Sequence, residues 1–314
     1  MKNTKLGKLV IITTIVAAVA IAGAGTIGLS VGIYSFKGGN LKKGKRGSTA
    51  IDKSKSFRLE GIGAIDISTI SADIIIRSSK REDIEVHFHG TVRTTHQDNI
   101  PQLVTEQGDN ILHIYTERKR DFSIGYLESH LVLELNIPEV YQRRLTVKSV
   151  SGDLDLADHV FSILSLTTTS GDIDLNQVHT GPFMMKTTSG DLHADGLFSE
   201  NSEFSSVSGD IEIHSYTGDV GVNTTSGDIT LGYTEFANRV DINSTSGEVY
   251  LTLPGSAEFR LEARSTSGDI SCKFPIQLSG ADTGDSKHSI SGDVGSASHL
   301  ITVRTISGDI KIMS

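Results

Sequence analysis

The sequence has little of what crosslinks or stiffens most small folds. Its 314 residues include one cysteine, Cys272, no tryptophan, five prolines and 6% aromatic residues. A single cysteine excludes an internal disulfide framework. Beyond the N-terminus helical signals are scarce, whereas 32 glycines between short alternating runs are typical of many short strands joined by glycine turns.

Acidic residues are absent from the N-terminal part of the chain. Residues 1–46 contain eight basic residues and no acidic one. The remainder therefore holds 21 of the 29 Lys and Arg residues and all 38 Asp and Glu residues, a net charge of −17. Because nucleic acid is bound largely through its negatively charged phosphates, this acidic body argues against a nucleic-acid partner.

One long run near the N-terminus carries no charge. Leu9–Ile33 is 25 residues long, and a bilayer needs about 20 apolar residues, so we expect a transmembrane helix. Ala22–Ala24 resembles a cleavage site, which makes a removed signal peptide the alternative. We therefore divide this part into a short basic N-terminus (1–8), a single-pass membrane anchor (9–33) and a basic flexible linker (34–49).

The orientation of this anchor depends on its two basic flanks. The short basic N-terminus resembles that of a signal anchor that exports the C-terminal remainder of the chain, which predicts an extracellular body. The larger number of positive charges in Lys37–Arg46 favours the opposite arrangement, with the body in the cytoplasm. We expect the first orientation and keep the second as the alternative.

The body is organised by a repeated Ser-Gly-Asp motif. Eight copies end in Asp and one ends in Glu248, and the spacings between successive copies are 19, 19, 19, 18, 20, 21, 24 and 16 residues. A near-constant period of about 20 residues indicates stacked repeats. The motif serines are Ser151, Ser170, Ser189, Ser208, Ser226, Ser246, Ser267, Ser291 and Ser307.

Apolar residues occupy fixed places around each motif. They lie six and four residues before the serine and three and five after it, as in Leu164, Leu166, Ile173 and Leu175 around Ser170. Side chains alternate faces along a strand, so this change of parity requires a corner, for which we expect glycine to supply a positive φ. The pattern predicts an all-β, single-stranded β-helix (β-solenoid) of about 19 residues per coil over 146–314.

The region before the regular repeats also shows the alternating apolar pattern that is typical of strands. Ser71-Ala72-Asp73 is a degenerate copy of the motif, and other alternating runs come after it. We expect residues 50–145 to form the irregular first coils of the same solenoid, with a separate small β-domain as the alternative. Two segments share a further feature, because Pro138 and Pro254 each precede a motif serine by 13 residues.

These patterns together resemble a known family. The arrangement I/L-P-x₇-L-x-(V/A)-x-(S/T)-x-S-G-D-(I/L), repeated behind an N-terminal anchor, resembles the bacterial "putative adhesin" β-solenoid family, which includes LiaG-like membrane-anchored envelope proteins. The resemblance covers residues 55–314. It implies a β-helix at the cell surface that acts in adhesion or in a cell-envelope stress response, and it brings no catalytic residues.

The acidic residues of the motif form the most prominent candidate site. Stacked coils would place them about 5 Å apart, where backbone N–H groups at a corner can bind each carboxylate. Calcium-binding β-rolls use a shorter repeat with more glycines, so we expect a structural turn column and keep a calcium ladder as the alternative. The column contains Asp153, Asp172, Asp191, Asp210, Asp228, Glu248, Asp269, Asp293 and Asp309.

Other candidate chemistry is weaker. Asp174, His193 and Glu212 fall on successive coils and could process a polysaccharide, but a solvated face has the same composition. His87 and His89 share a strand face and could bind a metal, although the sequence shows no third ligand. Cys272 falls in an apolar column and should be buried. We therefore assign no catalytic, cofactor-binding or metal-binding residue.

The anchor and the solenoid together define the expected function. We expect a non-catalytic, single-pass cell-membrane protein whose solenoid contacts an unidentified envelope component or protein ligand. The alternative is a cytoplasm-facing, membrane-tethered scaffold in which copies of the chain assemble through solenoid ends. This alternative rests on the C-terminus, because Ile310–Ile312 ends the chain with little sequence left to cap the last coil.

Overall fold

The computed structural model describes residues 47–94, 99–118, 127–278 and 287–314. The expected anchor lies outside these residues, and within them no helix is long and apolar enough to cross a membrane. Every regular element described is a β-strand. The strands are β1 Gly47–Arg58, β2 Ala64–Ser68, β3 Asp73–Ser79, β4 Asp83–Thr94, β5 Gln102–Gly108, β6 Ile111–Glu117, β7 Leu127–Pro138, β8 Arg144–Lys148, β9 Leu154–Ala157, β10 Val160–Phe161, β11 Ile163–Thr167, β12 Ile173–Lys186, β13 Leu192–Ser206, β14 Ile211–Thr224, β15 Ile229–Tyr233, β16 Val240–Ser246, β17 Val249–Thr252, β18 Phe259–Ser265, β19 Ile270–Cys272, β20 Gln277–Leu278, β21 Ser289–Val294, β22 Leu300–Ser307 and β23 Ile310–Met313.

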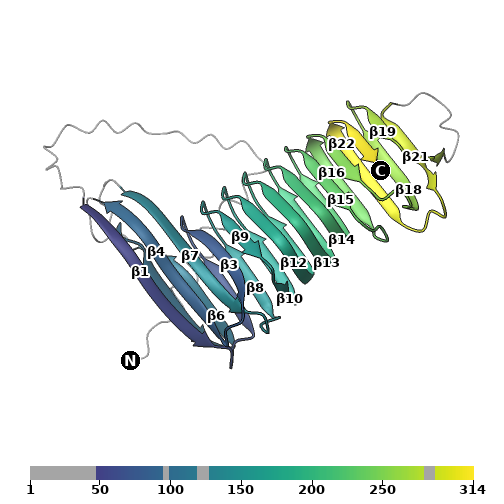
Figure 1. Cartoon of the computed structure of the whole chain (residues 1–314). Helices are drawn as coiled ribbons and strands as arrows, with labels where there is room; N and C mark the ends of the chain where they lie inside the picture. The colour runs from purple at the N-terminus through teal and green to yellow at the C-terminus, as the bar shows by residue number, and fades with distance from the viewer. Residues whose placement is uncertain (1–46, 95–98, 119–126, 279–286) are drawn as a thin grey trace, which may run out of the picture. The chain divides into compact units, whose positions relative to one another are not determined.

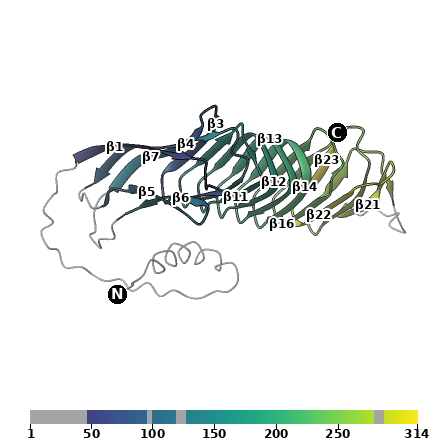
Figure 2. The same cartoon turned by 90° about the horizontal axis from the view of Figure 1, so that it is seen from below.

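The prediction of an all-β solenoid is confirmed. Each regular coil makes one turn and pairs in parallel with the coil before it and the coil after it, as β13 does with β12 and β14. The residues after each motif form one long face, and the residues before the next motif form the other. Figure 2 shows the two faces, with β3 and β23 along one and β6, β11, β16 and β22 along the other.

A second corner separates the two faces. It lies seven residues after the motif serine, and there four successive coils place a residue in the left-handed region. The φ angles are +56° at Asp158, +49° at Gln177, +78° at Gly196 and +58° at Ser215. Three of these residues are not glycine, so the composition of the sequence does not reveal this corner.

The core is a continuous stack of apolar side chains between the faces. The columns predicted from the sequence point inward around Ser170: Leu164 and Leu166 are fully buried before the motif, and Ile173 and Leu175 are 2% exposed after it. These residues belong to one hydrophobic cluster that extends from Ile51 to Ile312. Each coil therefore buries its apolar side chains against its two neighbours, as expected for stacked repeats.

The order of the coils in space departs from their order in the chain at the C-terminal end. The last coil, formed by β22 and β23, lies between the coil of β16 and β17 and the coil of β18 and β19. Figure 1 shows β22 between β16 and β18. The chain thus leaves one coil position empty after β17, builds the next coil, and returns to fill the gap.

The N-terminal end repeats this arrangement. The coil of β2 and β3 lies between β6 and β7 on one side and β8 and β9 on the other. The segment after β7 therefore crosses one coil to reach β8, just as the segment after β17 crosses one coil to reach β18. Pro138 and Pro254, which share their phase in the sequence, stand at the start of these two crossings.

Antiparallel strands cover the N-terminal end of the stack and one face of the other end. β1 and β4 extend the face of β7, and β5 pairs with β6 on the other face. At the far end β21 pairs antiparallel with both β18 and β20. The expectation of an uncapped C-terminal coil is therefore wrong, because β22 and β23 have neighbours on both sides and the chain returns into the stack.

Candidate functional site

The motif aspartates form a ladder of hydrogen bonds between coils. The carboxylate of each residue accepts the backbone N–H of the corresponding residue in the next coil. The N···O distances are 2.9 Å from Asp172 to Asp153, 2.9 Å from Asp191 to Asp172 and 2.8 Å from Asp210 to Asp191. Asp73 of the degenerate copy starts this ladder by accepting the N–H of Asp153 at 3.2 Å. The carboxylates stay exposed, so their repulsion is screened by water.

Buried hydroxyl groups two residues before the serine close most of the corners from within the coil. Thr187 Oγ1 accepts the N–H of Gly190 at 2.9 Å, and Thr168 Oγ1 accepts that of Gly171 at 2.9 Å. The motif serine binds across coils instead, and Ser189 donates to the Thr169 carbonyl at 3.2 Å. In these coils both hydroxyl columns are therefore engaged in the corner, whereas Thr305 Oγ1 in the coil of β22 has no hydrogen-bond partner within the described residues.

The motif glycine has the predicted positive φ at three corners, Gly227, Gly247 and Gly308, and a different role at the others. At Gly152, Gly171, Gly190 and Gly209 the φ angle lies outside the left-handed region. An added Cβ would instead lie 2.0–2.1 Å from a carbonyl oxygen of the neighbouring coil. The expectation of a positive φ is wrong at these corners, because glycine is required there for the close approach of two backbones.

Two members of the acidic column depart from the ladder. The N–H of Glu248 binds Asp228 at 2.8 Å, but its own longer side chain reaches Lys311 Nζ at 2.7 Å. The hydrogen bond from Lys311 lowers the pKa of Glu248. Asp293 lies within β21, not at a corner, and binds Arg260 Nε at 2.7 Å, which lowers its pKa. The turn role expected for Asp293 is therefore corrected.

The three residues considered for polysaccharide processing do lie side by side. Asp174 pairs in register with His193, and His193 with Glu212, on neighbouring strands. His193 Nδ1 lies 3.5 Å from Glu212 Oε2, and His214 Nε2 lies 2.8 Å from Oε1 of the same carboxylate. The hydrogen bond with His214 lowers the pKa of Glu212. About half of each of the His193, Glu212 and His214 side chains is exposed, as on a solvated face.

The structure adds a third ligand to the histidine pair seen in the sequence. His87 and His89 point outward from β4, and Glu134 lies opposite His87 on β7. One possible ligand atom from each residue lies within 4.8 Å of the other two. Glu134 is distant in the sequence and carries no motif, so only the pairing of β4 with β7 could have identified it.

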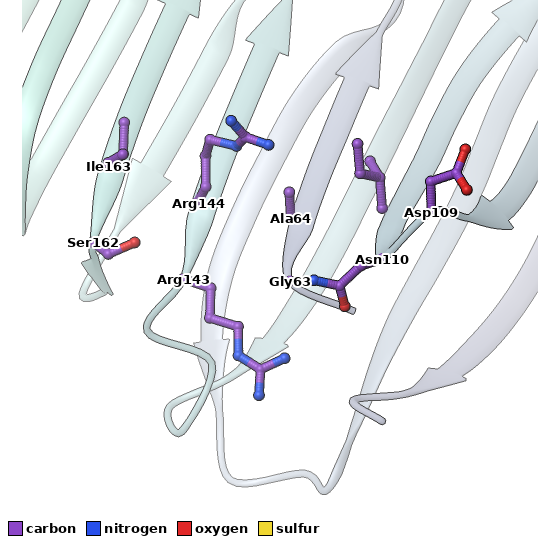
Figure 3. Close-up of a pocket in the computed structure, with 9 residues that line it drawn as sticks. Gly63, Ala64, Asp109, Asn110, Arg143, Arg144, Ser162 and Ile163 are labelled. Carbon is purple, nitrogen blue, oxygen red and sulfur yellow. The ribbon is translucent and has the colours of Figure 1, made fainter. Parts of the chain in front are cut away.

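An open cleft of about 380 Å³ lies where the coil of β2 and β3 meets its out-of-order neighbours. Figure 3 shows that the side chains of Arg143 and Arg144, which line it, point in different directions. The Arg143 guanidinium is engaged by the Ile62 carbonyl. The two cations therefore do not converge on one point where an anion could bind.

Cys272 is half-buried, and not fully buried as predicted. It lies on β19, whose coil has a parallel neighbour on one side only within the described residues. Burial still raises the pKa of its thiol, so the thiolate form is disfavoured. Its partial exposure is explained by its position in the coil of β18 and β19, which stands at the end of the stack.

Comparison with known proteins places the described solenoid in a family. The profile of the family described as Toastrack DUF4097 matches residues 62–313. This range runs from the first inserted coil to the second. No curated protein sequence matches the chain.

Several solved structures are similar to this chain at low sequence identity and low TM-score. A putative adhesin from Bacteroides fragilis has 14% identity and a TM-score of 0.42, over 84% of this chain and 97% of that chain. A putative lipid binding protein from Parabacteroides distasonis has 14% identity and a TM-score of 0.42, over 83% and 96%. A putative adhesin from Parabacteroides merdae has 12% identity and a TM-score of 0.35, over 83% and 95%.

Proposed function

The chain belongs to the Toastrack DUF4097 family, and from this premise we propose that it is a non-catalytic binding module held at the cell membrane and displayed outside the cell. In this role the solenoid provides a rigid, acidic surface for an envelope component or a protein ligand, in an adhesin-like or envelope stress-response function. The anchor proposed for this role is the apolar run Leu9–Ile33.

The motif residues and the outward-facing residues have different roles, and this difference supports the proposal. The polar groups of the repeated motif form hydrogen bonds between neighbouring coils, as Asp172 and Ser189 do. The outward columns carry unlike side chains from one coil to the next. One of them runs Asp155, Asp174, His193, Glu212, Thr230, Tyr250 and Lys311. A uniform scaffold with a varied surface suits recognition of a partner.

The scaffold alternative keeps the same fold in a different place. A cytoplasm-facing protein that assembles with copies of itself is the second candidate. Its orientation is favoured by Lys37–Arg46, which carries more positive charge than the N-terminal flank. Its contact surface would not be the C-terminal coil. Within the described residues, strands with a partner on one side only include β1 and β5 at one end and β19 and β20 at the other.

Protease treatment of intact cells tests the proposal. The full-length chain, carrying a C-terminal epitope, is expressed in a bacterial host, and the cells are treated with protease before and after lysis. Loss of the epitope without lysis is the expected result, while a cytoplasmic marker protein stays intact. Protection of the epitope until lysis would contradict an extracellular solenoid and favour the cytoplasmic scaffold.

A further inference from the structure

The outward side of β1, β4 and β7 carries a compact group of imidazoles and carboxylates. β4 is hydrogen-bonded between β1 and β7, with His87 opposite Glu134 and His89 opposite Asp52. The intervening Phe88 is fully buried and anchors the strand from below. Four polar side chains from three strands are therefore fixed on one small area of the surface.

The distances within this group suit a shared ion. His87 Nδ1 and His89 Nε2 each lie 3.9 Å from Glu134 Oε2, and the two imidazole rings are 4.4 Å apart. Ligand atoms around a tetrahedral zinc ion are separated by about 3.3 Å, given metal–ligand distances of about 2.0–2.1 Å. The side chains are partly exposed, so rotation can bring the three atoms toward that separation.

Asp52 supplies the outer contact that metal-binding histidines usually have. Its Oδ1 atom lies 2.9 Å from His87 Nε2. A carboxylate oxygen can only accept a hydrogen bond here, so the contact favours the tautomer in which His87 Nε2 carries the hydrogen and donates it. His87 Nδ1, which faces Glu134, then carries the lone pair that can bind a metal, as in the carboxylate–histidine–metal arrangement.

The second group of histidines differs in these respects. His193 and His214 approach opposite oxygens of Glu212, and their rings are 5.9 Å apart. The Glu212 carboxylate is already hydrogen-bonded to His214 at 2.8 Å. This group has the same composition, two histidines and a glutamate, and is more exposed, but it lacks the convergence of three donors, which makes it a matched control.

We propose that His87, His89 and Glu134 bind one Zn²⁺ ion, with Asp52 as the positioning residue for His87. Two imidazoles and a carboxylate favour zinc over calcium or magnesium, which prefer oxygen ligands alone. About one third of each ligand side chain is exposed, so a fourth coordination position faces solvent. A donor group of a bound partner can occupy that position.

Calorimetric titration of the purified full-length chain with Zn²⁺ tests this site. The chain is stripped of metal and carries no polyhistidine tag. We expect one equivalent of Zn²⁺ to bind, Glu134→Gln to weaken affinity by more than about 100-fold, and Asp52→Asn to weaken it by about 10–100-fold, the usual effect of an outer-shell partner. The double variant His193→Gln/His214→Gln should bind as the unaltered chain does.

Two results would overturn the proposal. One is an unaltered chain that shows no Zn²⁺ binding, and the other is a loss of affinity in the His193/His214 variant equal to that in Glu134→Gln. Thermal unfolding of each metal-free variant separates a binding defect from misfolding. Because all the changed side chains point outward, these metal-free midpoints should match that of the unaltered chain.

Discussion

The middle coils and the end coils of this solenoid obey different rules of order. From β8 to β17 each coil pairs with the next coil in the chain. At each end one coil is inserted between two others that are consecutive in the chain. The repeated motif therefore specifies how a coil stacks, whereas the connections specify which coil it stacks on.

The two crossings at the ends use the same local structure. The N–H of Tyr141 binds the Pro138 carbonyl at 2.8 Å, and the N–H of Ala257 binds the Pro254 carbonyl at 2.9 Å. Each crossing is also attached to the coil that it passes, through Ser79 in the first case and Met313 in the second. Equivalent turns therefore build equivalent gaps, which an earlier segment of the chain fills at one end and a later segment at the other.

Removal of the C-terminal coil should have the largest effect on this arrangement. Truncation after Ser298 removes four fully buried side chains, Ile301, Val303, Ile310 and Ile312. At about 1.5–3 kcal/mol each, their burial contributes about 6–12 kcal/mol, an upper estimate. We expect residues 254–298 to become sensitive to limited proteolysis while the coils of β8–β17 remain resistant, because repeat stability is local.

A longer truncation serves as the control for this experiment. Truncation after Pro254 removes the inserted coil together with the strands that cover it, so the remaining coils from β8 onward keep chain order. We expect the fragment that resists proteolysis to be the same size in both truncations. If residues 254–298 stayed resistant after the shorter truncation, the coil of β22 and β23 would lie at the end of the stack. Its insertion between the other two coils would then be refuted.

The addition of a single methyl group to a motif glycine of the middle coils should have the next largest effect on stability. In Gly190→Ala the new Cβ would lie 2.0 Å from the Gly171 carbonyl oxygen. The coils must separate locally, so we expect a loss of about 3 kcal/mol in the free energy of unfolding, the upper end for overpacking. Chemical denaturation measures this loss, and equal stability of Gly190→Ala and the unaltered chain would refute the close approach.

An end-region glycine provides the matched change. Gly108 closes β5, and nothing lies within 4 Å of a Cβ added there. Its φ angle is outside the left-handed region, so alanine fits without strain. We expect Gly108→Ala to change stability by less than about 0.5 kcal/mol, as surface substitutions commonly do.

Much of the coil could be predicted from the sequence, and little of the coil order. Alternating columns such as Leu164 and Leu166 identify the inward face because burial imposes a period of two. The shared phase of Pro138 and Pro254 marks the crossings, but it does not say which segment fills each gap, since all coils offer the same columns. Glu134 joins His87 and His89 only through strand pairing, and no local pattern encodes that contact.

Apart from the Gly108→Ala control, the smallest predicted effect concerns the ladder that joins the middle coils. Asp191→Ala removes the acceptor for the N–H of Asp210, a bond of 2.8 Å, and we expect a loss of about 1 kcal/mol in the free energy of unfolding. Asp191→Asn keeps the side-chain oxygen and should lose less stability than Asp191→Ala does.

Addition of Ca²⁺ should leave the thermal midpoint of the unaltered chain unchanged, because the ladder is satisfied by backbone N–H groups. A midpoint that rises with Ca²⁺ in the unaltered chain but not in Asp191→Ala would instead establish a calcium ladder. The ladder is interrupted at Glu248, in the coil that pairs with the inserted coil of β22 and β23. The same measurements on Glu248→Asp therefore show whether a shorter carboxylate extends the middle pattern into the end.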